Sequence, residues 1–405
     1  MTKSDRTALR TLLLCQGVLV AGLALSFPFM TLYLHQRRGL PMGMTGLAVS
    51  LSVVATAVGQ GLGGELSDLW GCKRVMSASL AGRVVLMILM ALAIALAWPV
   101  FVIVTLLVCA GFFGSFYDPA VRAWIAGEHP AAGRVRAYGQ LRVATNAAWA
   151  VGPAVGGLMA GVSYALMFGV TSALCLVCLG LLVWVVPDAP ASRTGEGFAW
   201  GSVASVSKDR RFLEFCGLSV LAATVMSHLV APLSVHATAH GGLTEPQVGL
   251  LFALNGILVV LLQRAATRAI SARALTSAAV LGCLLYALGW SWMGFARGWA
   301  LLAGAMTVVT LGEIVVSPSL QALAANLAPD QVRGRYIGFH GLMTQLVMAL
   351  GPLLGGISAE QLGGRWVPAP WLAVGALAAF TGWGFSRLGR HLRPAEQGLH
   401  PLGVL

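Results

Sequence analysis

One carboxylate, that of Glu313, lies inside a long apolar stretch of the chain. Residues 299–318 contain no other charged residue, and the stretch is long enough to cross a bilayer as a helix. An ionised group there costs roughly 2.5–3.5 kcal/mol on insertion scales. Such groups usually move protons, ions or substrates, and burial disfavours the ionised form, so Glu313 is a candidate for loading and unloading a proton. The alternative is a neutral or hydrogen-bonded carboxyl group that serves helix packing.

The elements that carry this residue are predicted by the composition. The chain is 58% apolar and 10% charged, whereas soluble proteins carry about 25% charged residues. Because lipid offers the backbone no hydrogen-bond partners, apolar stretches of this length must be helices. We therefore predict an all-α integral membrane protein with twelve transmembrane helices, near residues 10–34, 44–64, 75–98, 100–125, 140–160, 164–186, 212–235, 247–263, 274–295, 299–322, 334–358 and 370–387.

The basic residues orient these helices in the membrane. The net charge is +12, and most of the 26 lysine and arginine residues fall in loops on one side of the predicted membrane; Arg37, Arg38, Arg297 and Arg365 fall on the other side. This asymmetry is typical of a membrane protein that obeys the positive-inside rule, and it does not mark a nucleic-acid-binding face. We expect a multi-pass protein of the inner membrane of a bacterium, with both termini cytoplasmic.

The two halves of the chain follow one plan. The shift that aligns Pro119 with Pro318 also aligns two further pairs, Gly152-Pro153 with Gly351-Pro352 and Gly156-Gly157 with Gly355-Gly356. It predicts two six-helix bundles related by a pseudo-twofold axis along the membrane normal, with a cavity between them. The bundles cover residues 1–186 and 212–393, with a cytoplasmic linker at 187–211 and a tail at 394–405. The same shift aligns Glu313 with Gly114, so the acid belongs to one half only.

A loop motif between the second and third predicted helices gives the family resemblance. It reads Gly64-Glu-Leu-Ser-Asp68-Leu-Trp-Gly71-Cys-Lys73-Arg74, and it resembles the signature of the major facilitator superfamily. Leu69 and Cys72 depart from positions where arginine is common. We expect the glycines to allow close packing and a sharp turn. The resemblance implies transport by rocking of the two bundles, with Asp68 in a charge latch at the cytoplasmic face. The alternative is an ordinary basic loop.

Further charges lie near this face. Asp118 and Arg122 are four residues apart and share a helix face, and Arg142 opens the fifth predicted helix. The resemblance implies that they join Asp68 in a cytoplasmic charge relay; the alternative is a set of helix-end charges in the headgroup zone. The family's usual arginine in the middle of the fourth helix is missing. Arg83 lies in the third helix, and we expect its side chain to extend to the cytoplasmic surface.

The fifth predicted helix contains Gly152-Pro153 followed by Gly156-Gly157. This segment resembles the Gly-Pro motif of the drug:proton antiporter branch of the superfamily. Its glycines let helices approach closely, and its proline favours a kink. The second copy, from Gly351 to Gly356, leaves packing alone as an explanation of both.

These observations favour a proton-coupled secondary transporter that exports small amphipathic compounds, with Glu313 as the proton carrier. Polar residues inside the helices are candidates for lining the substrate cavity, namely Gln16, Asn146, Asn255 and Gln345. The alternatives are a symporter that imports small solutes or peptides, and a non-transporting receptor or scaffold. We expect a monomer without cofactor or metal whose partners are substrate, protons and lipid. No clustered catalytic residues indicate an enzyme.

Overall fold

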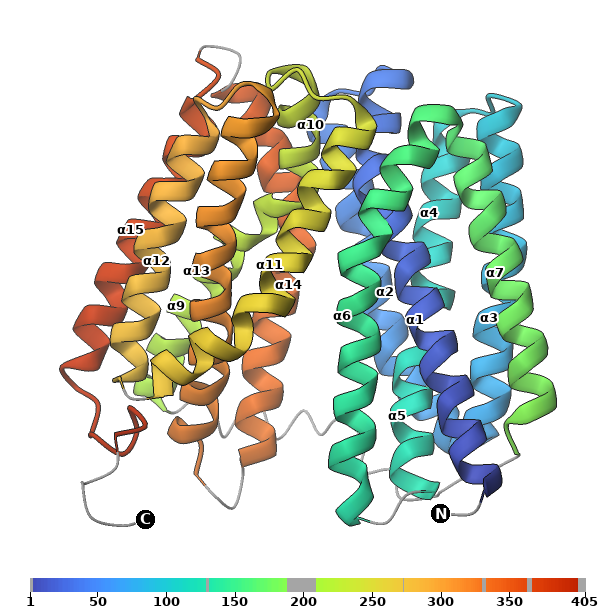
Figure 1. The fold of residues 1–405 in the computed structure, drawn as a ribbon, viewed down its shortest axis with the longest axis horizontal. Coiled ribbons are helices and arrows are strands. Elements are labelled where there is room, and N and C mark those ends of the chain that lie inside the picture. The colour runs from blue at the N-terminus through green and yellow to red at the C-terminus, as the bar shows by residue number, and fades with distance from the viewer. Residues whose placement is uncertain are drawn as a thin grey trace. The chain divides into compact units, whose positions relative to one another are not determined.

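In the computed structural model, residues 3–128, 131–187, 209–271, 273–329, 333–362 and 366–399 are described, and each regular element among them is helical (Figure 1). The chain divides into two compact units. Unit 1 comprises residues 1–197 and 244–256, and unit 2 comprises residues 198–243 and 257–405.

The helices of the two units have the following bounds. Unit 1 contains α1 (Lys3–Leu32), the π-helix η1 (Tyr33–Arg37), α2 (Met42–Trp70), α3 (Cys72–Ala95), α4 (Val100–Gly114), α5 (Tyr117–Glu128), α6 (Ala131–Val162) and α7 (Tyr164–Val185). Unit 2 contains α9 (Arg210–Met226), the 3-10 helix η2 (Ser227–Leu229), α10 (Ala231–Ala239), α12 (Leu275–Met293), α13 (Gly298–Leu327), α14 (Arg333–Gln361) and α15 (Ala369–Gly389). Helix α11 (Glu245–Ser271) contributes its first part to unit 1 and the rest to unit 2.

The prediction of twelve transmembrane helices is confirmed for the described part of the chain. Each predicted apolar stretch lies in a helical segment, with α4 and α5 sharing one stretch and α9, η2 and α10 sharing another. Ten of the described helical segments are long and apolar enough to cross a membrane. The other two predicted stretches lie in the helices α6 and α15.

Two of the predicted helices are broken, each next to a proline. The fourth stretch is interrupted between α4 and α5, just before Pro119, and the seventh is interrupted around η2, just before Pro232. A proline removes a backbone N–H and its ring clashes with the carbonyl four residues earlier, which opens the helix there. Pro153, Pro318 and Pro352 lie inside continuous helices, so the sequence alone did not decide which prolines would break a helix.

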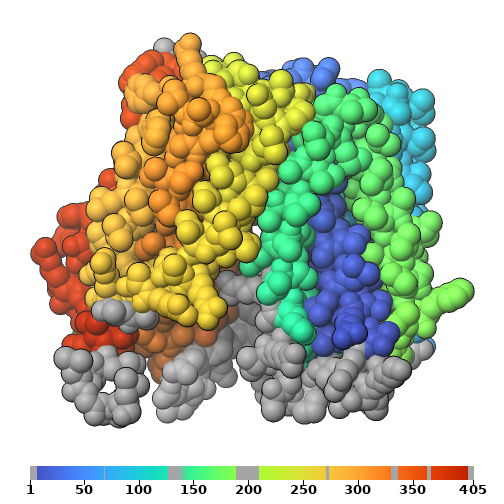
Figure 2. Space-filling view, in the orientation of Figure 1, coloured from blue at the N-terminus to red at the C-terminus, as the bar shows by residue number. Residues whose placement is uncertain are grey.

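The helix packing within each unit repeats the duplication seen in the sequence. In unit 1, α3 packs against α4 and α7, and in unit 2 the corresponding α12 packs against α13 and α15. Figure 2 shows α1 between α6 and α7 on one face of unit 1, where the side chains close the spaces between the helices. The buried core of this unit gathers on α1, α3, α5, α6 and α7, and it includes Cys15, Tyr117 and Cys175.

Candidate functional site

Glu313 lies halfway along α13. The helix has 30 residues from Gly298 to Leu327, so about 22 Å of helix precede this residue and about 21 Å follow it. Its side chain is half-buried within unit 2, between the buried residues Gly312 and Ile314. The helix thus holds the carboxyl group near the middle of a transmembrane segment, as its position in the sequence suggested.

Two polar neighbours of Glu313 come from other helices. Tyr286 of α12 is 1% exposed, and it interacts electrostatically with Glu313. Its ring packs so closely on Gly312 that a Cβ added there would lie 2.7 Å from the ring atom Cδ1. Gln263 of α11 donates from Nε2 to the carbonyl oxygen of Ile314 at 3.2 Å. Sequence reasoning missed Gln263, although an amide among the apolar residues of a transmembrane helix was a usable signal.

The equivalent position in unit 1 holds a cation instead. Gly114 aligns with Glu313 in the repeat, and a Cβ added at Gly114 would lie 2.6 Å from Nη1 of Arg83. Nε of Arg83 is buried and has no hydrogen-bond partner, and none of the described carboxylates lies within ion-pair distance of its guanidinium. Arg83 is the twelfth residue of α3, about 16 Å from the start of the helix. The prediction that it extends to the cytoplasmic surface is therefore wrong, because the gap at Gly114 accommodates the guanidinium inside the unit.

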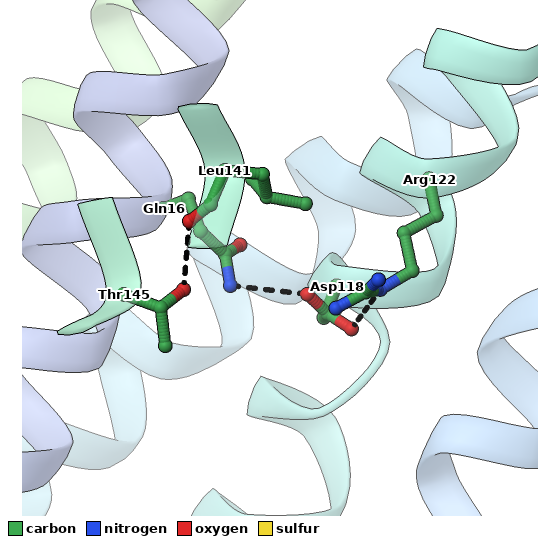
Figure 3. Close-up of polar contacts among 5 residues, drawn as sticks. All are labelled: Gln16, Asp118, Arg122, Leu141 and Thr145. Carbon is green, nitrogen blue, oxygen red and sulfur yellow. Dashed lines mark hydrogen bonds and ion pairs between the residues drawn. The ribbon is translucent and has the colours of Figure 1, made fainter. Parts of the chain in front are cut away.

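A second polar cluster in unit 1 joins Gln16 to Asp118 (Figure 3). Gln16 of α1 is 5% exposed and donates from Nε2 to Oδ1 of Asp118 at 3.1 Å. The other carboxylate oxygen, Oδ2, accepts from Nε of Arg122 at 2.7 Å. Thr145 stands beside them in Figure 3, but its hydroxyl donates to the carbonyl of Leu141 in its own helix.

This cluster is built by the break before α5. Because the helix restarts at Tyr117, Asp118 lies in the first turn of α5, where the positive end of the helix dipole favours a carboxylate. Its two oxygens accept bonds from different helices, α1 and α5, so the carboxylate ties the two together. The ion pair of Asp118 with Arg122 confirms that the two residues share a helix face, whereas the bond of Asp118 to Gln16 was not predicted. The cytoplasmic charge relay stays a prediction.

The loop motif between α2 and α3 is only partly described. Gly71 has φ +89° and links the two helices directly, which confirms the sharp turn. The close packing expected at Gly64 is not seen, since an added Cβ there meets no atom within 4 Å; one residue earlier, at Gly63, it would lie 2.7 Å from Cα of Phe116. Lys73 is half-buried and Arg74 exposed. The side chains of Asp68 and Arg142 lie outside the described residues, so the latch stays a prediction.

Both Gly-Pro copies form close helix contacts. In unit 1, Cβ atoms added at Gly152 and Gly156 would meet α1, the first 2.7 Å from Cβ of Ala24 and the second against the carbonyl oxygen of Leu25. Gly157 contacts the part of α11 that belongs to unit 1, at Gly249.

In unit 2, added Cβ atoms at Gly351 and Gly355 would overlap Ser227 and Pro232, which belong to the helical segment equivalent to α1. Pro352 and Gly356 are buried beside them. Packing therefore accounts for both copies.

The remaining cavity candidates lie on three different helices and differ in exposure. Asn146 on α6 and Gln345 on α14 are exposed, and Asn255 on α11 is half-buried. Their role in a substrate cavity stays a prediction.

Comparison with known proteins places these features in a family. The chain matches the model of the Major Facilitator Superfamily over residues 12–352 and 215–401. It is 28% identical to the MFS-type transporter YttB of Bacillus subtilis (strain 168) over 364 residues, which cover 88% of this chain and 90% of YttB. It is 24% identical to the multidrug resistance protein MdtH of Escherichia coli O9:H4 (strain HS) over 398 residues, which cover 93% of this chain and 94% of MdtH.

A solved structure supports the fold. The crystal structure of the nucleoside transporter NupG matches with a TM-score of 0.76 at 14% identity, over 96% of this chain and 99% of NupG. With the helical architecture and the family match across most of its length, the chain belongs to the major facilitator superfamily and is a multi-pass membrane transporter of small molecules.

Proposed function

We propose that this transporter exports small amphipathic compounds in exchange for protons, by alternating access in the inner membrane of a bacterium. The observation that carries the proposal is the position of Glu313. A half-buried carboxyl group in the middle of a transmembrane helix can change its protonation state as its access to water changes.

The surroundings of Glu313 suit a group that gains and loses a proton. Tyr286 gives it a buried aromatic neighbour with a hydroxyl group. Gln263, one helix away, already donates to the backbone beside it. The relative MdtH is named a multidrug resistance protein. That name supports drug-like compounds as the substrate class and export as the direction of transport.

The cluster around Asp118 supplies a candidate cytoplasmic gate. Its carboxylate accepts from a buried amide on one side and from a side chain that is 56% exposed on the other. An exposed ion pair contributes about 0–1 kcal/mol, so the Arg122 bond can be exchanged at low cost while the Gln16 bond persists. With Asp68, Lys73 and Arg142, this cluster would open and close the cytoplasmic face.

The test uses everted membrane vesicles that are acidified inside by respiration. Ethidium is added as the first of a panel of amphipathic dyes. If export is proton-coupled, the transporter moves ethidium into the lumen and protons out of it, and the fluorescence of a pH-sensitive dye is restored. Glu313→Gln should abolish this response while the protein remains folded in detergent chromatography. The control is Glu214→Gln, which makes the same change at an exposed carboxylate of α9.

The outcomes separate the alternatives. A normal response in Glu313→Gln would remove this residue from coupling. If the wild-type protein instead accumulates solutes in proteoliposomes when protons flow inward with them, it is a symporter and the export proposal is wrong. If no compound of the panel moves in either assay, the amphipathic substrate class is wrong.

A further inference from the structure

A pocket of about 440 Å³ opens at one end of unit 2. It lies where α10 ends, where α12 is connected to α13, and where α15 begins, at the end that carries the α10 label in Figure 1. Small-molecule sites commonly have volumes of about 300–1,000 Å³. The charge pattern of the loops predicts that this end faces away from the cytoplasm. The pocket is separate from Glu313, which lies at the middle of α13.

The charged and titratable side chains of this pocket are all basic. Arg297, His236 and His240 line it, and none of the described lining residues carries a carboxylate. Arg297 and His240 are exposed, and Arg297 makes no ion pair with the described carboxylates. The wall therefore presents a guanidinium group and an imidazole to whatever enters.

His236 fixes the geometry of this wall. It is 6% exposed, and its Nδ1 accepts from the indole Nε1–H of Trp371 at 2.9 Å. Because an indole nitrogen can only donate, the ring proton of His236 is on Nε2, which lies 3.1 Å from the carbonyl oxygen of Met293. His236 is thus a neutral, fully bonded ring. His240 stacks on it with ring centroids 5.5 Å apart, so its orientation is set by a fixed partner.

The backbone adds to the attraction for anions. Helix α13 begins directly after Arg297 and α15 directly after Pro368, and neither N-terminus is capped by a side chain. Helix N-termini carry a partial positive charge, although the first N–H of each helix is already bonded here, that of Gly298 to the carbonyl of Gly241 and that of Ala369 to the carbonyl of Trp366. A guanidinium, an imidazole and two helix ends together suit an anion that has several acceptor oxygens.

The rim of the pocket is aromatic. Phe295 and Trp366 are 56% and 54% exposed, and their rings meet edge to face with centroids 6.0 Å apart. Exposed aromatic side chains at the ends of transmembrane helices are typical of the headgroup region of the bilayer. A ligand here would place its charged group on the basic wall and an apolar part against these rings.

We propose that this pocket binds a phosphate group, with Arg297 and His240 as its ligands. Two sources carry that group: an anionic phospholipid of the surrounding membrane and a soluble phosphate. His236 acts as the positioning residue that holds His240.

The test uses the purified full-length protein in detergent and in nanodiscs. Retention of phosphatidylglycerol is measured by native mass spectrometry, with phosphatidylcholine for comparison, and binding of inorganic phosphate is measured by thermal stabilisation in detergent. Arg297→Gln should weaken binding about tenfold or more, as expected for the loss of one charge-assisted hydrogen bond. Arg390→Gln, at an exposed arginine near the other end of α15, is the control and should change nothing.

Each result decides between the sources or overturns the proposal. Binding of phosphatidylglycerol alone identifies a lipid headgroup, and equal binding of inorganic phosphate identifies a soluble ligand. Binding of either probe must depend on Arg297 and on His240, the latter tested with His240→Gln. If neither probe binds the wild-type protein, or if Arg390→Gln weakens binding as much as Arg297→Gln, the pocket is not a phosphate site.

A separate variant tests the positioning role of His236. His236→Phe should preserve the fold while weakening binding through the loss of the Trp371 bond, and unchanged binding would remove this role.

Discussion

A glycine-to-alanine comparison within α14 tests whether close packing explains the Gly-Pro motif of unit 2. A Cβ added at Gly351 would overlap the Cβ and Oγ of Ser227 and would lie 3.2 Å from its Cα. Ser227 cannot simply rotate away, because its Cβ is fixed to the backbone. Ten residues earlier in the same helix, a Cβ added at Gly341 meets no atom within 4 Å. The two sites therefore receive the same chemical change in different surroundings.

The magnitude follows from two opposing effects. Alanine is favoured over glycine inside a helix by roughly 0.5–1 kcal/mol, and both variants gain this. Overpacking destabilises a folded protein by about 1–3 kcal/mol, and only Gly351→Ala introduces it. The free energy of unfolding should therefore be lower in Gly351→Ala than in Gly341→Ala by about 1–3 kcal/mol.

The assay is reversible unfolding in mixed micelles, titrated with sodium dodecyl sulfate and followed by tryptophan fluorescence. If the two variants agree within about 0.5 kcal/mol, the close contact with Ser227 has no energetic weight and the packing explanation fails. If Gly351→Ala is less stable but still transports with proton coupling, the motif serves packing. Loss of coupling without loss of stability would give it a specific role in the antiport reaction.

Two further predictions concern unit 1. Gln16→Leu should destabilise the protein more than Arg122→Gln does. A hydrogen bond to a charged group contributes about 1.5–3 kcal/mol, whereas an exposed ion pair contributes about 0–1 kcal/mol. The same unfolding assay ranks the two variants, and the reverse order would contradict the arrangement in Figure 3. Arg83→Leu should leave stability unchanged or raise it, because replacing a buried cation that has no ion pair with the described carboxylates removes a desolvation cost. A clear loss of stability would show that the guanidinium has a strong partner.

Much of the architecture could be predicted from the sequence because lipid imposes simple rules on it. A run of about 20 apolar residues must be a helix, and a glycine such as Gly71 is suited to a turn with positive φ. The breaks could not be predicted in the same way. Pro119 and Pro318 are equivalent in the repeat, yet only the first interrupts a helix. The difference lies in packing, since the break before Pro119 fits against Gly63 of α2.

The candidate site shows the same limit. The importance of Glu313 followed from one charge in an apolar run, because such a charge is visible in the sequence without knowledge of the helices that pack around it. The bond between Gln16 and Asp118 joins residues 102 positions apart, and neither belongs to a periodic pattern that would indicate the other. Gln263 reaches the backbone beside Glu313 only because α11 lies next to α13 there. Contacts of this kind depend on how helices pack, which hydropathy does not encode.

The comparison of the two units gives Glu313 and Arg83 a shared context. In unit 1, Arg83 on α3 packs against Gly114 on α4, and in unit 2 the equivalent pair is Gly282 on α12 and Glu313 on α13. A Cβ added at Gly282 would lie 3.0 Å from the carbonyl oxygen of Gly312, so α12 and α13 approach each other closely there. The same junction therefore holds one charged side chain and one glycine in each unit, with opposite sign and on opposite helices. Packing explains why each junction needs a glycine, but it does not require a charge in either. If Arg83→Leu proves as stable as the wild type while altering the pH dependence of transport, the charge of Arg83 serves function rather than folding.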